Sequence, residues 1–351
     1  MSQDGSWIHE ARNVLQESNV DYFAIRPWRY WLDFLVSLVP AYGFSSVFLS
    51  APLFSPIQCV AFPLAVFWLY RLGSLVHEVA HLGHKEMRVF KVVWNLVVGV
   101  MTLSPSPFFT RHHRDHHSAR LYGTQQDPEY VRNMYSVAGR WGVLLFGLEI
   151  AVLPLVVFLR FLLAPLTFLH PRLRELALRR GSSLTLNWRY QRRLTAFDRK
   201  ALTAIELLCW IRASLIPGAV LMGWTDWTRL PLLYALGVSV VALNQLRLLA
   251  DHHLSSDGDH ALDLESHILD SCNYTCRDGL TWLLFPFAIR YHALHHLFPS
   301  LPYHNLAAAH ARLLADLSLE SPYRGLDRPG WWSVARSAFR SPVSPSSSPS
   351  T

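Results

Sequence analysis

Residues 56–81 read PIQCVAFPLAVFWLYRLGSLVHEVAH. Up to Val76 the stretch is broken only by Arg71, and about 20 such residues in a helix cross the roughly 30 Å of hydrocarbon in a bilayer. HEVAH follows at once, and its i, i+4 spacing places His77 and His81 on one helix face. The stretch therefore predicts a membrane helix that ends in a pair of imidazoles.

The composition of the whole chain agrees with a membrane protein. Of the 351 residues, 51% are hydrophobic and only 16% are charged, which is too apolar for an ordinary soluble enzyme. We expect an all-α integral membrane protein with four transmembrane helices in two hairpins, interfacial helices and a cytoplasmic cap that carries the histidines. The expected spans are residues 31–54, 56–76, 202–222 and 230–250.

Two further apolar runs, 89–103 and 143–169, are expected to lie at the membrane interface. The connection Arg172–Lys200 is strongly basic and should therefore be cytoplasmic. The histidines before and after it must reach the same side to form one site, so 143–169 cannot cross once, and it is too short for the roughly 40 residues of two crossings. It also contains Glu149, Pro154, Arg160 and Pro165, which suit an interfacial or re-entrant element.

The remaining segments set the domain plan. Residues 1–30 are polar with no visible signal peptide and form a cytoplasmic N-terminal segment. Residues 31–323 form one membrane domain, and 324–351 form a C-terminal tail that is disordered from about 340, where Ser and Pro dominate. The net charge of +7 lies beside apolar runs, where it suits anionic lipid headgroups, so we expect no nucleic-acid partner.

Two more histidine clusters share one spacing. Residues 111–117 read RHHRDHH and residues 292–296 read HALHH, and both contain HxxHH, in which helical geometry brings three ring nitrogens together. With 18 histidines in 351 residues, a given window matches HxxHH with a probability on the order of 10⁻⁴. Two matches beside HEVAH therefore indicate metal binding better than the alternative, polar helix ends at the membrane surface.

The number of histidines constrains the metal. Imidazoles alone suit iron, copper, zinc or nickel, but eight exceed what one tetrahedral zinc needs and suit two metals of higher coordination number. A redox-active metal pair can activate dioxygen and remove hydrogen from an unactivated carbon, which no side chain can do. HEVAH also matches HExxH, so a membrane zinc protease using His77, Glu78 and His81 is an alternative, although it leaves both HxxHH clusters unexplained.

From about His77 to Tyr323 the chain resembles the membrane fatty-acid desaturases. The likeness rests on HEVAH, on RHHRDHH with LYGTQQDPEY behind it, on QLRLLADHH, and on YHALHHLFPSLPYHNL with AHARL. The resemblance implies a non-haem di-iron centre on the cytoplasmic face, four spanning helices in two hairpins, and an acyl chain in a tunnel beneath the metals.

By the same resemblance the metal ligands are nine histidines. They are His77, His81, His113, His116, His117, His252, His292, His295 and His296. His112 competes with His113, and His253 competes with His252. Some members have an asparagine four residues before the extra histidine, whereas here that position is Leu248 and the nearest asparagine is Asn244.

The implied reaction is the oxygen-dependent introduction of a double bond into an acyl chain carried on a lipid, coenzyme A or a carrier protein. A lipid or carotenoid hydroxylase or ketolase of the same superfamily is the alternative. No cytochrome b5 domain is fused, because His170-Pro171 lacks the glycines of the haem motif. Electrons are therefore expected from a separate ferredoxin, rubredoxin or cytochrome b5 with its reductase, at a bacterial inner membrane with the site on the cytoplasmic face.

Several other residues are candidates around the site. Glu78, Asp127 and Asp251 are carboxylates next to the histidine clusters, and such groups commonly orient metal-bound imidazoles. The aromatic residues Trp68, Tyr70 and Trp282 are candidates for the lining of the acyl path, with packing at the interface as the alternative.

Overall fold

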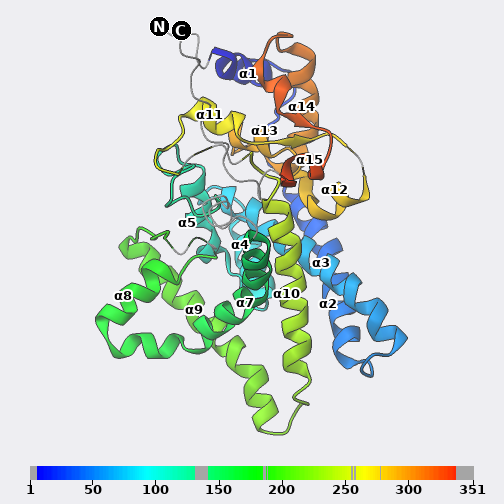
Figure 1. Ribbon diagram of the computed structural model, residues 1–351, viewed down its shortest axis with the longest axis vertical. Coiled ribbons are helices and arrows are strands. Elements are labelled where there is room, and N and C mark those ends of the chain that lie inside the picture. The colour runs from blue at the N-terminus through cyan, green and yellow to red at the C-terminus, as the bar shows by residue number, and fades with distance from the viewer. Residues whose placement is uncertain are drawn as a thin grey trace.

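The computed structural model describes residues 6–130, 141–184, 187, 189–253, 256, 258–276 and 278–336. These residues are mostly helical, as predicted. The strands in this part of the chain are β1 (Asn273–Tyr274) and β2 (Asp327–Arg328), which pair in parallel. Figure 1 shows long helices at one end of the molecule and shorter helices, among them α1 and α14, at the other.

Five long helices in the described residues are apolar enough to cross a membrane. They are α2 (Pro27–Ser50), α3 (Pro56–His81), α7 (Gly142–Leu162), α9 (Ala196–Leu221) and α10 (Arg229–Leu248). Four of them overlap the predicted spans: 56–76 lies within α3, and the other three predicted spans run one to four residues past the ends of α2, α9 and α10. The helix α3 continues beyond Val76, so that the HEVAH histidines form its last turn.

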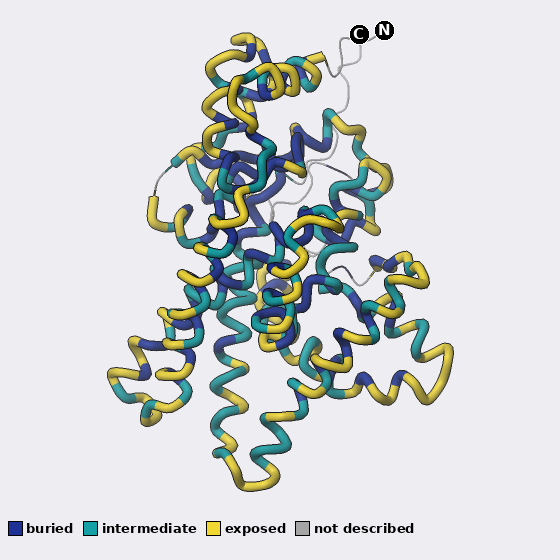
Figure 2. The backbone as a smooth tube through the Cα atoms, turned by 180° about the vertical axis from the view of Figure 1, so that it is seen from behind, coloured by how far each residue is buried: buried dark blue, intermediate teal, exposed yellow. Residues whose placement is uncertain are grey.

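Local sequence explains where two of these helices begin. The Ser55 hydroxyl accepts a hydrogen bond from the Gln58 amide at the start of α3, and Pro56 occupies the first turn. Thr195 and Asp198 form a reciprocal capping box at the start of α9. Large apolar side chains on these long helices face outward, among them Val39 in α2 and Leu148 in α7. Figure 2 shows exposed residues along their length, as expected of a multi-pass integral membrane protein.

The helix α7 is where the structure departs from the expected plan. Residues 143–169 form this continuous helix followed by the 3-10 helix η3 (Ala164–Leu169), and α7 is a fifth possible span by length and composition. Near its start, Phe146 packs in the same cluster as Leu249, just beyond α10. Near its end, Phe161 contacts Phe108 in α5 (Ser106–His116). Both ends of α7 therefore contact segments that carry histidines of the site. With α7 as a fifth candidate, the expected number of four transmembrane helices remains a prediction.

The two expected hairpins differ in packing. The helices α2 and α3 pack closely along their length. The helices α9 and α10 are joined by a short turn that exposes Trp224 and Trp227, but they pack little against each other: α9 packs mainly against α7, and α10 packs against both α7 and α3. In Figure 1, α9 and α10 diverge from this turn.

A buried ion cluster fixes α7 to its neighbours. Glu206 of α9 pairs with Arg160 of α7 at 2.5 Å and with Arg174 of α8 (Pro171–Arg180) at 2.5 Å. Only 1% of Glu206 is exposed. The cluster therefore joins the end of α7 and the basic helix α8 to the first half of α9.

The segment 89–103, expected at the interface, is divided into short elements. It forms α4 (Arg88–Trp94) and the π-helix η1 (Asn95–Gly99). Phe90, Trp94 and Val98 are buried in the core together with Phe34 of α2 and Leu75 of α3. This segment is thus part of the main core next to the histidine end of α3.

The short elements form a cap over the histidine ends of the long helices. Besides α5, the cap contains α1 (Ser6–Gln16), α11 (Leu264–Leu269), α12 (Gly279–Leu284), η4 (Pro286–Ala288), α13 (His292–Leu297), α14 (Tyr303–Asp316), η5 (Pro322–Leu326) and α15 (Trp331–Ala335). In the N-terminal segment, α1 packs against α14. In the expected tail, Trp331 is buried, whereas the disorder predicted from about residue 340 lies outside the described residues.

Candidate metal centre

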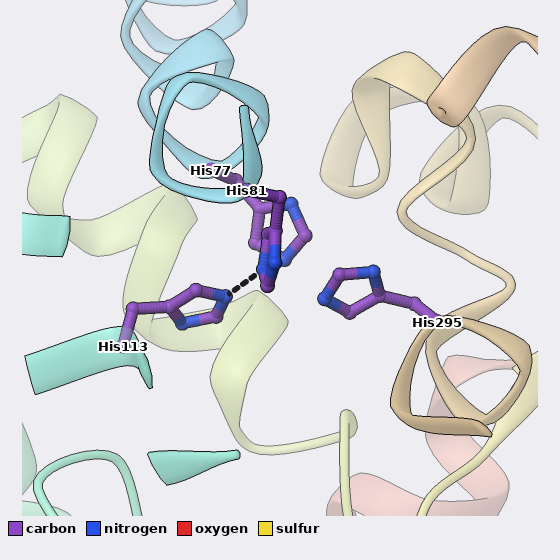
Figure 3. Close-up of side chains that lie close together, drawn as sticks. All are labelled: His77, His81, His113 and His295. Carbon is purple, nitrogen blue, oxygen red and sulfur yellow. Dashed lines mark hydrogen bonds between the residues drawn. The ribbon is translucent and has the colours of Figure 1, made fainter. Parts of the chain in front are cut away.

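Four histidines from three separate helices form the first histidine group. His77 and His81 come from the last turns of α3, His113 from α5 and His295 from α13 (Figure 3). One ring nitrogen from each can be chosen so that all four lie within 4.8 Å of one another. The helical spacing read from the sequence therefore does bring HEVAH to the same point as one residue of each HxxHH cluster.

A second histidine group lies beside the first. It consists of His116, His252, His292 and His296, again with ring nitrogens within 4.8 Å of one another, and all four are buried. His252 belongs to this group although it lies outside the three clusters. Its Nε2 atom is 3.2 Å from Nε2 of His116 and 3.1 Å from Nε2 of His292.

The ninth predicted residue, His117, lies between the two groups. Its Nε2 atom is 3.2 Å from Nε2 of His113 and 3.1 Å from Nε2 of His295, both in the first group. Its ring stacks on His296 of the second group with 4.2 Å between centroids. All nine histidines expected from the sequence are therefore gathered in one continuous site.

The distances between the ring nitrogens fit shared metal ions. Nε2 of His113 lies 2.9 Å from Nε2 of His81, and Nε2 of His296 lies 2.9 Å from Nε2 of His292. Two nitrogens that bind one metal at about 2.1 Å, at right angles, are roughly 3.0 Å apart. Each group therefore has the spacing of neighbouring ligands on one ion.

Hydrogen bonds on the outer side of the rings fix their orientation. The partner atoms contact Nδ1 and leave Nε2 facing the interior of the site. They are Glu129 for His113 at 2.6 Å, Asp127 for His116 at 2.8 Å, and the Tyr122 hydroxyl for His252 at 2.8 Å. Tyr122 donates its own proton to Asp270 at 2.8 Å, so its oxygen accepts from His252. In its neutral form, each of these imidazoles therefore donates from Nδ1 and presents a lone pair on Nε2.

These inward lone pairs need a positive partner. Nitrogens at about 3 Å that all present lone pairs repel one another, and the cost is large in a buried, weakly polarisable interior. Nε2 of His77 is buried and has no hydrogen-bond partner in the described residues. A pair of metal ions would satisfy these atoms together, so the residues present fit the di-iron centre that the resemblance implies.

The electrostatics of the site keep most of its imidazoles neutral. Burial, reinforced by neighbouring histidines, holds the pKa values of His113, His252 and His295 well below the ordinary range. Burial also acts to lower the pKa of His116, but the adjacent Asp127 carboxylate outweighs it and raises this pKa to about 9. Neutral imidazoles are the form that binds metal ions.

The two ambiguous neighbours lie outside both groups. The His112 Nδ1 atom lies 3.1 Å from the Phe108 carbonyl oxygen, within its own helix. The His253 Nε2 atom accepts a hydrogen bond from Arg328 at 2.8 Å. Of each adjacent pair, therefore, the structure brings His113 and His252 into the groups and directs His112 and His253 elsewhere.

The three candidate carboxylates have different surroundings. Asp127 bonds to His116, as expected for an orienting group. Glu78 lies 3.4 Å from Nδ1 of His77, and its other oxygen accepts hydrogen bonds from Tyr30 and Tyr303. Asp251 instead pairs with Arg247 at 2.5 Å.

The aromatic candidates for the acyl path have ordinary packing roles in the structure. The Tyr70 hydroxyl donates to the Leu284 carbonyl, which ties α3 to α12. Trp282 is exposed and stacks on Phe67, which also contacts Trp68. These contacts support the packing interpretation.

Three residues around the site were not predicted from the sequence: Glu129, Tyr122 and His267. Glu129 stands in the same Asp-Pro-Glu turn as Asp127, so that turn carried a signal for it. The His267 Nε2 atom lies 2.6 Å from Nδ1 of His296, and its ring stacks on Tyr122 at 3.5 Å. His267 belongs to none of the histidine clusters in the sequence, because its contact is made between α11 and α13 in space.

Comparison with known proteins agrees with this geometry. A family model described as fatty acid desaturase matches residues 53–326, which is most of the chain and includes all nine histidines. The chain belongs to the fatty acid desaturase family. Within this family it is 35% identical over 315 residues to a protein of Caulobacter vibrioides (strain NA1000 / CB15N) named ceramide hydroxylase, and the match covers 89% of this chain and 88% of that relative. The resemblance read from the histidine motifs is thereby confirmed.

Proposed function

We propose that this protein is an oxygen-dependent oxidoreductase that introduces a double bond into the acyl chain of a lipid. The observation that carries the proposal is the convergence of two four-histidine groups, with His117 between them, at the cap end of apolar helices. The proposed ligands are His77, His81, His113, His116, His117, His252, His292, His295 and His296. Two iron ions bound there would supply dioxygen activation and hydrogen abstraction from an unactivated carbon.

The protein itself orients the imidazole rings and excludes water from the site. Outer partners such as Asp127 and Glu129 hold the imidazole rings in the tautomer that faces inward. Almost every ring of the site is buried, so a substrate methylene there would be shielded from solvent. The apolar exteriors of α2, α3 and α7 support a position of the site next to the lipid phase, where acyl chains are found.

Hydroxylation is a second candidate outcome, because the Caulobacter relative is named a ceramide hydroxylase. The same chemistry removes the first hydrogen in both reactions, and the position of the substrate decides whether a second hydrogen is lost or oxygen is added. The zinc protease has less support. The carboxylate of Glu78, its required base, is buried and engaged by Tyr30 and Tyr303.

We further propose that the site faces the cytoplasm at a bacterial inner membrane. Electrons would come from a separate ferredoxin, rubredoxin or cytochrome b5 with its reductase. The Glu206 cluster fixes the basic helix α8 beside α9. Because basic segments next to membrane helices favour the cytoplasmic side, this arrangement supports a cytoplasmic position for the histidine site.

Expression in a host of simple lipid composition, with an added ceramide pool, tests the function. New double bonds in acyl chains support desaturation, and new hydroxyl groups support hydroxylation. The His295→Ala variant is the matched control and should leave the lipid profile unchanged. Purified protein that contains one zinc and no iron, yet remains active, would refute both outcomes.

A further inference from the structure

Basic residues gather on one surface next to the first histidine group. Three segments, 82–91, 111–115 and 189–200, form this surface, which we call the basic face. Together they contain ten basic and three acidic residues. The excess of seven positive charges equals the formal net charge of the whole chain, so the remaining residues are balanced in charge. A charge imbalance confined to one surface favours a negatively charged partner.

Contacts between side chains join the three segments. The ring of His84, just beyond the end of α3, lies 6.2 Å from the ring of Phe197 in the first turn of α9. The Tyr190 hydroxyl donates a hydrogen bond to the Asp115 carboxylate in α5 at 2.7 Å. The basic face is therefore one surface, which lies where α5 and the end of α3 approach the start of α9.

The acidic residues of the basic face already have partners within it. Each is held by a neighbour: Asp115 by Arg111, Asp198 by Arg192, and Glu86 by the Gly83 amide. Lys85, Arg114 and Arg193 are exposed, and they have no acidic partner in the part of the chain that the structure describes. The positive charge of the basic face is therefore free to attract a partner from outside.

Arg114 connects the basic face to the first histidine group. This exposed residue follows His113 directly in the chain. Its Nη2 atom donates a hydrogen bond at 2.9 Å to the carbonyl oxygen of Ala80, which is the residue before His81. The basic face is therefore separated from two of the proposed metal ligands by few bonds.

The proposed oxidation needs electrons that the lipid does not supply. Reduction of one dioxygen molecule to two waters takes four electrons and four protons. Desaturation takes two of each from the substrate, so two electrons and two protons must come from elsewhere. Hydroxylation places one oxygen atom in the lipid and one in water, and it needs the same two electrons and two protons. Either reaction therefore requires a reduced carrier that can reach the metal ions.

We propose that the basic face docks a small acidic electron-transfer protein, with Arg114 at the point where this carrier comes closest to the first histidine group. The inference rests on the proposed oxidation and adds the docking surface and the charge of the electron donor. Interfaces of electron-transfer proteins are small and short-lived. Charge attraction then governs how often the carrier arrives, because it raises association rates about 10- to 1,000-fold.

The test is a binding titration of the purified iron-loaded protein in a neutral detergent, without lipid substrate. The probes are a plant-type ferredoxin and the soluble domain of cytochrome b5, two acidic carriers with different cofactors. The basic carrier cytochrome c is the control for charge. At least one acidic probe should bind, and its affinity should fall steeply as the ionic strength rises from about 0.05 to 0.5 M. Cytochrome c should not bind.

A double charge reversal, Lys85→Glu with Arg193→Glu, tests the surface. It should weaken binding of the acidic probe roughly 10- to 100-fold at low salt, because attraction becomes repulsion at two points of the basic face. The matched control is Arg12→Glu with Arg172→Glu, which changes the net charge equally at exposed positions of α1 and α8. This control should bind the probe with an affinity close to that of the wild type. Both double variants should retain iron and thermal stability, because exposed substitutions of this kind change stability little.

An equal loss of affinity in both double variants would overturn the proposal, because net charge rather than this surface would then attract the carrier. Failure of both acidic probes to bind, or equally tight binding of cytochrome c, would also overturn it. If neither acidic probe binds but phosphatidylglycerol vesicles bind the wild type and not the Lys85 and Arg193 double variant, the basic face contacts lipid headgroups instead.

The docking surface and the proposed function fail separately, because no lipid is oxidised during the titration. If a carrier binds at the basic face but no lipid is oxidised, the proposed function fails and the docking surface stands. If lipid is oxidised with a chemical reductant but no acidic carrier binds, the docking surface fails and the proposed function stands.

Discussion

The Nε2 atom of His267 lies 2.6 Å from the Nδ1 atom of His296, and both rings are buried. Because Nε2 of His296 faces the second histidine group, its Nδ1 carries the proton and donates it to His267. A neutral imidazole therefore orients His296, in the place that a carboxylate takes beside His113 and His116.

This contact leads to a prediction for His267. Replacement by Leu removes the acceptor and should lower metal affinity at the second group about 10- to 100-fold, the usual effect of losing an orienting partner. Replacement by Gln should retain most of the affinity, because its Oε1 atom can accept the same hydrogen bond. Iron content after a graded chelator challenge checks both variants. Full iron retention by His267→Leu would contradict the role.

The adjacent residues His252 and His253 provide a matched pair for the ligand assignment. His252→Ala removes a nitrogen from the second group and should abolish lipid oxidation and lower bound iron. His253→Ala removes side-chain contacts with Arg328 and Cys272, which lie outside both histidine groups, and should retain iron at the wild-type level. Elemental analysis and the lipid profile measure the two effects. The reverse pattern would assign the ligand to His253.

The cluster around Glu206 should be a major source of stability. Glu206→Gln leaves Arg160 and Arg174 without a buried counter-charge, and such a loss costs roughly 3–5 kcal/mol. The apparent melting temperature in detergent should therefore fall by several degrees. The control is Glu175→Gln, which removes solvent-exposed ion pairs with Arg179 and Arg199 and should change the melting temperature little.

Topology gives a further prediction. His116 and His252 meet at 3.2 Å, so an even number of crossings must separate them, yet three apolar helices, α7, α9 and α10, lie between them. We expect α9 and α10 to cross and α7 to lie at the interface. Its two ends support this, because both contact elements beside the histidines.

Cysteine labelling in intact cells checks this topology, in a background without the four native cysteines. Cysteines placed at Ser6 and Arg180 should be labelled from the same side, and one at Trp224 should be labelled from the other side. Labelling of positions 180 and 224 from the same side would mean that α9 does not cross the membrane. The helix α7 would then have to cross in its place.

The sequence by itself determined the membrane character and the family of this protein. Apolar length and helical spacing are local properties, so the runs at 31–54, 56–76, 202–222 and 230–250 and the pairing of His77 with His81 could be read directly. The HxxHH spacing likewise indicated that several imidazoles share one face. The family follows from the same motifs.

Only the tertiary structure decided which histidines meet and what holds them. The division into two groups, with His117 between them, depends on how α3, α5 and α13 approach one another. The choice of His252 over His253 depends on Arg328, which is 75 residues away in the chain. The position of His267 beside His296 likewise comes from a contact across helices, because a hydrogen bond between distant residues leaves no spacing pattern in the sequence.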